Sequence, residues 1–387
     1  MGDVPAPALP LPPALLIWKE APMTTPPGRP PLRISTPAGL LVVIPYVLGF
    51  SPASSLVVIG AGRRPVDRIQ VALRYDLPNP PSGKDAAEIA AHAIAVLARQ
   101  PVATAVVVGY GPGRLVTPVA DAIRRAAAGA GVELRDLLRV HDGRYWSYLC
   151  SEPSCCPADG VPFDAATHPA AKILARTGLP VLPDRDTLAA TIAPVTGPEA
   201  DAMAEATRRA ERAAARLIAR TGPHALDRPG LAAVRSAIGI SRDGGTITPA
   251  IGHAWLALVL TRLRIRDDAW ARMDPAHHGA HRRLWTDITR HARPGYVAAP
   301  ACLLAVTAWQ SGDGALANIA LDRALTDIPG YPMAQVLRDA LASGMPASAA
   351  APPMTPEEVE ASYTTLATRQ PTGTEEQAGP SGPATST

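Results

Sequence analysis

The sequence predicts an α/β fold, in which an N-terminal mixed sheet with flanking helices precedes a mainly helical C-terminal domain. Runs rich in β-branched residues alternate with helical patterns through the first half of the chain. From about Gly197 these runs disappear and a 3.6-residue apolar periodicity takes over. With 387 residues, of which 47% are hydrophobic, the chain is long enough for two packed domains.

Both ends of the chain differ in composition from the segment between them. Residues 1–31 are rich in proline and lack apolar periodicity, and residues 347–387 contain few large apolar side chains. Such segments bury too little surface to offset the conformational entropy lost on folding. We therefore expect a disordered leader at 1–31, an α/β domain at 32–195, a helical domain at 196–346 and a disordered tail at 347–387.

The α/β domain is predicted to begin with a short apolar helix. Thr36 is a candidate N-cap with Pro37 at the first helical position, and the helix stops around Pro45 or Gly49. This helix lies in the longest apolar run of the chain, residues 39–50. Because a bilayer requires roughly 20 consecutive apolar residues, the run is too short to be a membrane helix.

A hairpin, a helix and a central strand are expected next. The runs at 55–60 (SLVVIG) and 69–75 (IQVALRY) are separated by a segment containing Gly and Arg, which predicts two antiparallel strands. Residues 84–100 form a helix with one apolar face, comprising Ile89, Ala93, Val96 and Leu97. The fully apolar run at 102–108 is typical of a strand buried on both faces.

The domain continues with one helix and a second hairpin. Thr117 and Pro118 predict the start of a helix that ends near Gly129. Strand-like runs at 134–140 and 144–149 then flank the dipeptide Asp142-Gly143, which is a strong signal for a two-residue turn.

A glycine-rich turn connects the central strand to the following helix. Gly109, Gly111 and Gly113 precede Arg114, and a helix N-terminus with a nearby guanidinium could bind an anion. The dinucleotide-binding fingerprint is not met, since its third glycine would fall at Arg114. A tight strand-to-helix turn explains the same glycines, so both interpretations stay open.

Rare side chains gather after the Asp142-Gly143 turn, although aromatic residues make up only 4% of the chain and there are only four cysteines. On a strand, Trp146 and Tyr148 face one side and Tyr145 the other. These rings either fill the core or line a cleft with Arg144 at its rim, where stacking and a bidentate guanidinium would suit a planar or anionic ligand.

Three of the four cysteines follow at Cys150, Cys155 and Cys156. The prolines and polar residues between them predict a loop, where functional residues often lie. Structural zinc sites usually present paired Cys-x2-Cys knuckles and need four ligands, so this spacing gives no complete metal set. A metal, a redox or reactive thiol, and a purely structural loop remain open, and no cofactor is identified.

In the second half, residues 199–220 predict a solvated helix with a favourable Glu205–Arg209 pair. Four tryptophans are expected to anchor helix packing: Trp255, Trp270, Trp285 and Trp309. Residues 304–329 resemble one tetratricopeptide unit, with small residues at Ala305, Ala317 and Ala324. Because such units require stacked copies, we expect a helical hairpin within a larger domain.

Histidines and acidic residues are frequent around residues 267–291. His277 and His281 lie one helical turn apart, beside His278 and His291, and two imidazoles could share a metal ion. Because the His-Glu-x-x-His motif of metal-dependent hydrolases is absent, we expect an ordinary surface helix here.

Charge and targeting signals narrow the function class. The 37 basic and 34 acidic residues give a net charge of +3, which is too balanced to favour nucleic acid or an anionic membrane as partner. The first residues lack the features of a secretory signal, so we expect a cytoplasmic protein. In a reducing compartment, clustered thiols are free, redox-active or metal-bound rather than a disulfide framework.

Four strings carry a resemblance to a known family. They are PYVLGFSPASSLVVIG (45–60), HDGRYWSYLC with CCPADG (141–150 and 155–160), WLALVLTRLRIRDDAW (255–270) and AWQSGDGALANIALDRAL (308–325). Together they resemble the actinobacterial domain of unknown function numbered 4192 over about residues 32–346. The resemblance implies a soluble intracellular actinobacterial protein and carries over no reaction, cofactor or catalytic residue.

The sequence favours a non-catalytic binding or regulatory protein, because no nucleophile with a base and no paired carboxylates can be assembled. Its partner is expected to be a protein or a small anionic ligand. The alternative is an enzyme acting on a small anionic substrate at a cleft beside residues 144–156. In that alternative Arg144, Trp146, Cys155 and Cys156 line the site, and the turn from Gly109 to Arg114 cradles the anion.

Overall fold

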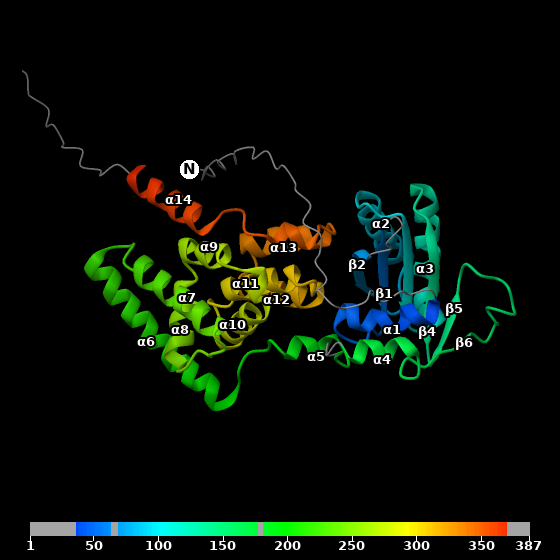
Figure 1. The fold of residues 1–387 in the computed structure, drawn as a ribbon, viewed down its shortest axis with the longest axis horizontal. Coiled ribbons are helices and arrows are strands. Elements are labelled where there is room, and N and C mark those ends of the chain that lie inside the picture. The colour runs from blue at the N-terminus through cyan, green and yellow to red at the C-terminus, as the bar shows by residue number, and fades with distance from the viewer. Residues whose placement is uncertain (1–35, 63–68, 177–180, 370–387) are drawn as a thin grey trace, which may run out of the picture. The chain divides into compact units, whose positions relative to one another are not determined.

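The computed structural model describes residues 36–62, 69–176 and 181–369. Within these ranges the strands form one six-stranded mixed sheet in the order β2-β1-β3-β4-β5-β6 (Figure 1). Only β3 and β4 are parallel neighbours, and the other neighbouring pairs are antiparallel. The strands are β1 (Ser55–Ala61), β2 (Ile69–Asp76), β3 (Thr104–Tyr110), β4 (Leu134–His141), β5 (Arg144–Ser147) and β6 (Val161–Pro162). The predicted α/β class is confirmed.

Strand β1 shows why strands of this sheet appear in the sequence as continuous apolar runs. Successive side chains of a strand point to opposite faces, and both faces of β1 are covered. Leu56 and Val58 pack in one core with helices α2 (Gly83–Arg99) and α3 (Gly113–Ala130). Val57 and Ile59 pack in a second core with helix α1 (Pro37–Leu48) and side chains of the helical half.

Helix α1 follows its sequence signals closely. The Thr36 hydroxyl oxygen accepts a hydrogen bond from the Gly39 N–H at 3.1 Å, and Pro37 occupies the first turn. Gly49 ends the helix with φ 78°, a left-handed conformation that glycine adopts without steric cost. The predicted cap and stop are both confirmed.

The start of α3 was predicted incorrectly. The helix begins at Gly113, not at Thr117, and Pro112 is its N-cap. Pro118 therefore lies inside the helix, where it removes one N–H from the helical ladder. The residues before Pro118 nevertheless stay helical, because Leu115, Val116 and Val119 are fully buried against the sheet.

The rest of the described chain is almost entirely helical, as predicted from Gly197 onward. The elements are α4 (Pro169–Ala175), α5 (Arg185–Ala190), α6 (Gly197–Thr221), α7 (Asp227–Arg242), α8 (Ala250–Val259), α9 (Leu263–Ala271), η1 (Pro275–His277), α10 (His278–His291), α11 (Ala298–Gln310), α12 (Gly314–Asp327), α13 (Pro332–Ala342), η2 (Ala347–Ala350) and α14 (Pro356–Arg369). No helix in the described ranges has both the length and the apolar character to cross a membrane. The domain boundary at residue 196 stays a prediction.

Helices α11 and α12 form the predicted helical hairpin. The small side chains of Ala305, Ala317 and Ala324 are buried where the two helices pack together. Asp313 caps α12, its carboxylate accepting from the Leu316 N–H at 2.9 Å. Of the four tryptophans expected to anchor packing, Trp285 and Trp309 are buried, and Trp255 and Trp270 are half-buried.

Helix α6 is not the fully solvated helix that the sequence predicted. One face is buried against α8, comprising Met203, Ala206, Thr207, Ala210 and Ala214. Alanines and a threonine carry little hydropathy in the sequence, yet their small size lets two helices approach closely. On the exposed face, Glu205 pairs with Arg208 and Arg212 rather than with Arg209.

Part of the expected disordered tail is ordered. Beyond residue 346 the chain forms η2 and α14, and Ala350 and Val359 are buried. The carbonyl oxygen of Ala350 accepts hydrogen bonds from Trp270 Nε1 and Gln310 Nε2, and the Tyr363 hydroxyl donates to Asp267. Specific polar contacts thus compensate for the low apolar content. The predicted leader at 1–31, the turn at 63–68 and the last residues of the tail lie outside the described residues.

Candidate functional site

The hairpin of β4 and β5 positions the cysteines. Its connection is the predicted dipeptide Asp142-Gly143, with positive φ angles of 47° and 68°. These left-handed conformations fit the right-handed twist of the paired strands. The register pairs Leu138 with Ser147, so β5 ends at the middle of β4 and the chain leaves the sheet there. The next residues form a loop, named here the cysteine loop (148–160).

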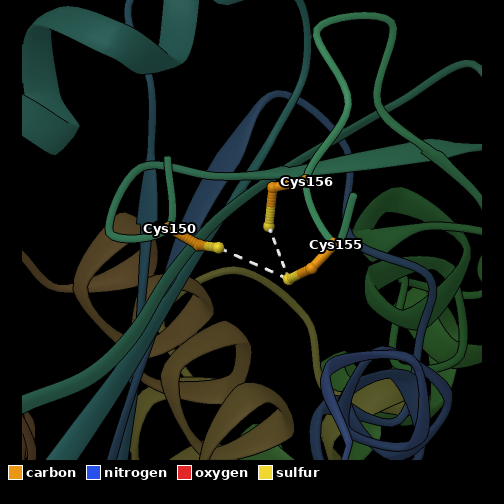
Figure 2. Close-up of side chains that lie close together, drawn as sticks. All are labelled: Cys150, Cys155 and Cys156. Carbon is orange, nitrogen blue, oxygen red and sulfur yellow. Dashed lines mark hydrogen bonds between the residues drawn. The ribbon is translucent and has the colours of Figure 1, made fainter. Parts of the chain in front are cut away.

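The cysteine loop brings three sulfur atoms together (Figure 2). Cys155 Sγ lies 3.4 Å from Cys150 Sγ and 3.4 Å from Cys156 Sγ, and the three sulfurs lie within 4.8 Å of one another. A tight turn makes this possible, because the N–H groups of Cys155 and Cys156 both donate to the Glu152 carbonyl oxygen. Cys155 is exposed, and the other two are half-buried.

Contacts within the cluster shift the pKa values of Cys150 and Cys156 in opposite directions. Hydrogen bonds from the Cys156 thiol, the Glu152 backbone N–H and the Cys155 thiol to the sulfur of Cys150 lower the pKa of Cys150. The hydrogen bond to Cys150 and burial raise the pKa of Cys156 to about 12. The arrangement therefore favours one thiolate, at Cys150, stabilised by its neighbours' protons.

Arg144 and Trp146 close the cysteine loop. Arg144 Nη1 donates to the carbonyl oxygens of Asp159 and Gly160, at 3.3 and 2.9 Å. Trp146 Nε1 donates to the Ala158 carbonyl oxygen at 3.0 Å. Gly160 has φ 78°, and a Cβ there would lie 2.5 Å from the Trp146 ring. The Arg144 guanidinium, predicted to meet an anion, is thus engaged with backbone carbonyls.

The aromatic side chains of β5 and the adjoining loop lie on opposite faces, as their alternation predicts. Tyr145 packs edge-on against Phe163, with ring centroids 6.4 Å apart, beside the helical core. Tyr148 packs beside the α2 and α3 core, and its hydroxyl lies 2.7 Å from Thr117 Oγ1. Trp146 stacks on the Arg139 guanidinium at 3.7 Å from the ring centroid.

The glycine turn adjoins the same aromatic face. A Cβ at Gly113 would lie 2.8 Å from Arg139 Nη1, and one at Gly111, where φ is 141°, would lie 2.8 Å from Leu115. A Cβ at Gly109 would likewise collide with the side chain of Val116, so close packing accounts for all three glycines. Arg114 is exposed in the first turn of α3. Arg139, which the sequence analysis did not single out, thus connects Gly113 to Trp146, and anion binding at this turn stays a prediction.

A second group of chemistry-bearing side chains lines a cavity of about 560 Å³, named here the histidine cavity. His253 of α8, Asp287 and His291 of α10, and Glu199 of α6 contribute to its wall. One donor atom from each of His253, Asp287 and His291 lies within 4.8 Å of the others. Sequence reasoning missed this set, and the available signal was the four-residue spacing of Asp287 and His291.

Of the four histidines singled out from the sequence, His291 lines the histidine cavity, whereas His277 and His281 contact Asp274. His277 Nδ1 lies 2.8 Å from the Asp274 carboxylate. His281 is buried, and its Nε2 accepts from the Asp274 N–H at 3.2 Å. Helix α10 is amphipathic: it buries His281, Leu284 and Trp285 on one face and exposes Arg282, Arg283 and Arg290 on the other. Burial lowers the pKa of His281 to about 4.

The sequence matches the family described as Domain of unknown function (DUF4192) over residues 37–348. Because this match spans most of the chain, the protein belongs to the DUF4192 family. No curated protein and no solved structure matches it.

Proposed function

We propose that this DUF4192 protein is a binding protein that captures a thiophilic metal ion at the cysteine loop. One observation carries the proposal: the sulfurs of Cys150, Cys155 and Cys156 lie within 4.8 Å of one another in a loop that is accessible to solvent. Thiolates are soft ligands that select Zn²⁺ and Cu⁺ over hard cations. Three thiolates suffice for a three-coordinate Cu⁺ ion, whereas Zn²⁺ would take a water molecule as its fourth ligand.

The spacing of the sulfurs supports this proposal. Sulfurs bound at about 2.3 Å to one ion lie roughly 3.8 Å apart, close to the 3.4 Å of two of the sulfur pairs. Binding would replace the hydrogen bonds between the thiols with metal–thiolate bonds. Since Cys156 has a pKa raised to about 12, its proton must be released when the metal binds. Affinity should therefore increase with pH.

The expected cytoplasmic location is part of the proposal. A reducing compartment would keep the three sulfurs unoxidised and available. Metal binding would fix the cysteine loop against β5, where Arg144 and Trp146 already hold its far end through Asp159, Gly160 and Ala158. Such a change in loop order is a means by which a binding protein can regulate a partner.

A cadmium titration of the reduced full-length protein tests the proposal. Cd²⁺ reports thiolate ligation through ultraviolet charge-transfer absorption, so it distinguishes this loop from nitrogen and oxygen sites. We expect one equivalent to saturate the signal, and Cys155→Ser to weaken binding by about 100-fold or more. Ser151→Ala, in the same loop, should bind as the natural protein does.

Two results would contradict the proposal. One is an absorption signal that Cys155→Ser leaves unchanged. The other is a freshly reduced protein that binds no Cd²⁺ and instead forms a Cys150–Cys155 disulfide in air, seen as a mass loss of about two hydrogen atoms, which oxygen takes up. Cys302 is buried in α11 and serves as the internal reference thiol in both measurements.

A further inference from the structure

The histidine cavity brings together side chains that are far apart in the chain. His253 Nε2 lies 2.7 Å from Asp287 Oδ2, and His291 Nδ1 lies 3.2 Å from Asp287 Oδ1. The two imidazoles stack, with centroids 4.2 Å apart and planes 23° apart. A single carboxylate thus contacts two imidazoles, and His253 and His291 are largely buried whereas Asp287 is a third exposed.

The hydrogen bonds of His291 determine which of its nitrogens carries a proton. Nδ1 lies 2.7 Å from the Asp287 backbone carbonyl oxygen, an acceptor, so Nδ1 carries the proton. In a neutral ring, Nε2 then presents its lone pair. Glu199 Oε1 lies 3.0 Å from Nε2. Two acceptors face each other there, and only a second proton or another cation between or beside them makes the contact favourable.

His253 shows a related imbalance. The residue is 6% exposed, its Nε2 contacts Asp287, and its Nδ1 is buried without a hydrogen-bond partner among the described residues. An unpartnered buried polar atom in a native fold indicates an interaction that protein atoms alone do not supply. His253 also lines the cavity, together with Asp287 and His291.

The charge and spacing of the set suit a metal ion. Asp287 contributes a carboxylate that contacts both imidazoles, at 2.7 Å from His253 and 3.2 Å from His291. One donor atom from each of the three side chains lies within 4.8 Å of the others, so small side-chain rotations bring all three within bonding distance of one ion.

We propose that His253, Asp287 and His291 bind one divalent transition-metal ion, with Glu199 as an additional carboxylate at the mouth of the cavity. Two imidazoles and one carboxylate form a borderline-soft ligand set, which favours transition metals over Ca²⁺ or Mg²⁺. Three protein ligands leave coordination positions open toward the cavity of about 560 Å³. This site is separate from the cysteine loop in residues and in ligand chemistry.

The test uses the full-length chain with Cys150, Cys155 and Cys156 replaced by Ser, so that the loop cannot bind the metal. Co²⁺ and Zn²⁺ are titrated calorimetrically, and bound Co²⁺ is observed by its visible absorption. We expect one ion per chain. Asp287→Asn, which keeps the side-chain volume, should weaken binding by about 100-fold or more. His278→Ala, on the same helix but outside the cavity wall, should leave it unchanged.

Glu199→Gln provides a second variant in case the substitution at Asp287 impairs folding. Glu199 is exposed at the start of α6, so its loss should leave the fold intact while weakening Co²⁺ binding by about 10-fold. The proposal is overturned if the triple-serine protein binds neither ion, or if binding is unaffected by both Asp287→Asn and Glu199→Gln. Either result would leave a protonated His291 paired with Glu199 as the explanation of the contact.

Discussion

The cysteine loop and the helical core around Trp285 place the same kinds of side chains in opposite surroundings. Trp285 is fully buried, whereas Trp146 is half-buried over Arg139. In the core, polar groups bind side chains of neighbouring helices. For example, the Asp268 carboxylate of α9 accepts hydrogen bonds from Arg235 of α7. In the loop, Arg144 and Trp146 bind backbone carbonyls of one short segment.

This difference separates global stability from local order. A side chain shared by several helices stabilises the whole fold, because its loss affects every helix that it touches. A side chain that binds only the cysteine loop affects how often that loop opens, at little cost to the fold. Substitutions in the two regions should therefore differ in both size and readout.

The largest effect is expected for Trp285, and Trp146 provides the comparison in the loop. Trp285→Ala should lower the free energy of unfolding by about 3–5 kcal/mol, since it removes a fully buried side chain. Trp146→Ala should lower it by only about 1 kcal/mol, mainly through the lost stacking on Arg139. Urea unfolding at neutral pH measures both values. Equal losses would show that the loop and the core share one cooperative network.

The second prediction concerns Asp268, which is 1% exposed and receives two hydrogen bonds from each of Arg235 and Arg272. Burial alone would raise the pKa of Asp268, but these two arginines lower it overall. Asp268→Asn should therefore cost about 2 kcal/mol of unfolding free energy near neutral pH. Asp243→Asn, at the exposed end of α7, is the matched control.

The unfolding free energy that Asp268→Asn removes should depend on pH in a defined direction. Because the folded pKa of Asp268 lies below its ordinary value of 3.8, the carboxylate contributes stability above that value and loses it as the pH falls through the folded pKa. The difference between the natural protein and Asp268→Asn should stay constant from about pH 7 to 4 and narrow only below that range. If the stability difference between the two proteins already narrows near pH 6, the pKa of Asp268 is not lowered in the folded state.

His281 gives a smaller effect in a milder pH range. Burial lowers its pKa from 6.5 to about 4, so below about pH 6.5 the unfolded chain takes up a proton that the folded chain does not. Stability should fall by roughly 1.4 kcal/mol by about pH 5.5, one unit below the unfolded pKa, and should continue to fall toward pH 4. His281→Gln should lose that part of the slope in urea unfolding, and His224→Gln, at an exposed position, should keep it.

The sequence predicted those features that depend on neighbouring residues. The Thr36 cap, the Asp142-Gly143 turn and the three-cysteine cluster each arise within a few positions, so local chemistry determines them. The fold class follows from periodicity, which is also local. The hairpin of α11 and α12 was recognisable because its small residues occupy the positions that a tetratricopeptide unit requires, and they are buried.

The features that sequence reasoning missed depend on contacts between distant segments. The histidine cavity requires α8 to lie against α10, and the spacing of His253 from Asp287 gives no indication of this packing. The start of α3 was misplaced because burial of Leu115 and Val116 outweighs the local signal of Pro118. Helix α14 was missed because single polar contacts, such as Tyr363 with Asp267, hold it.

The smallest change in global stability, with the clearest local readout, is expected for Arg144→Ala. Arg144 is exposed, and its loss removes the hydrogen bonds to Asp159 and Gly160 that close the cysteine loop. Loop opening should become easier by about 1 kcal/mol, which corresponds to a roughly fivefold faster alkylation of the half-buried Cys156. Residue-resolved mass spectrometry after iodoacetamide treatment measures that rate.

Arg114→Ala, exposed on α3, is the control, and Cys302 should stay unlabelled in both variants because it is buried. An unchanged rate at Cys156 would mean that its neighbouring thiols, rather than the Arg144 contacts, limit its access to solvent.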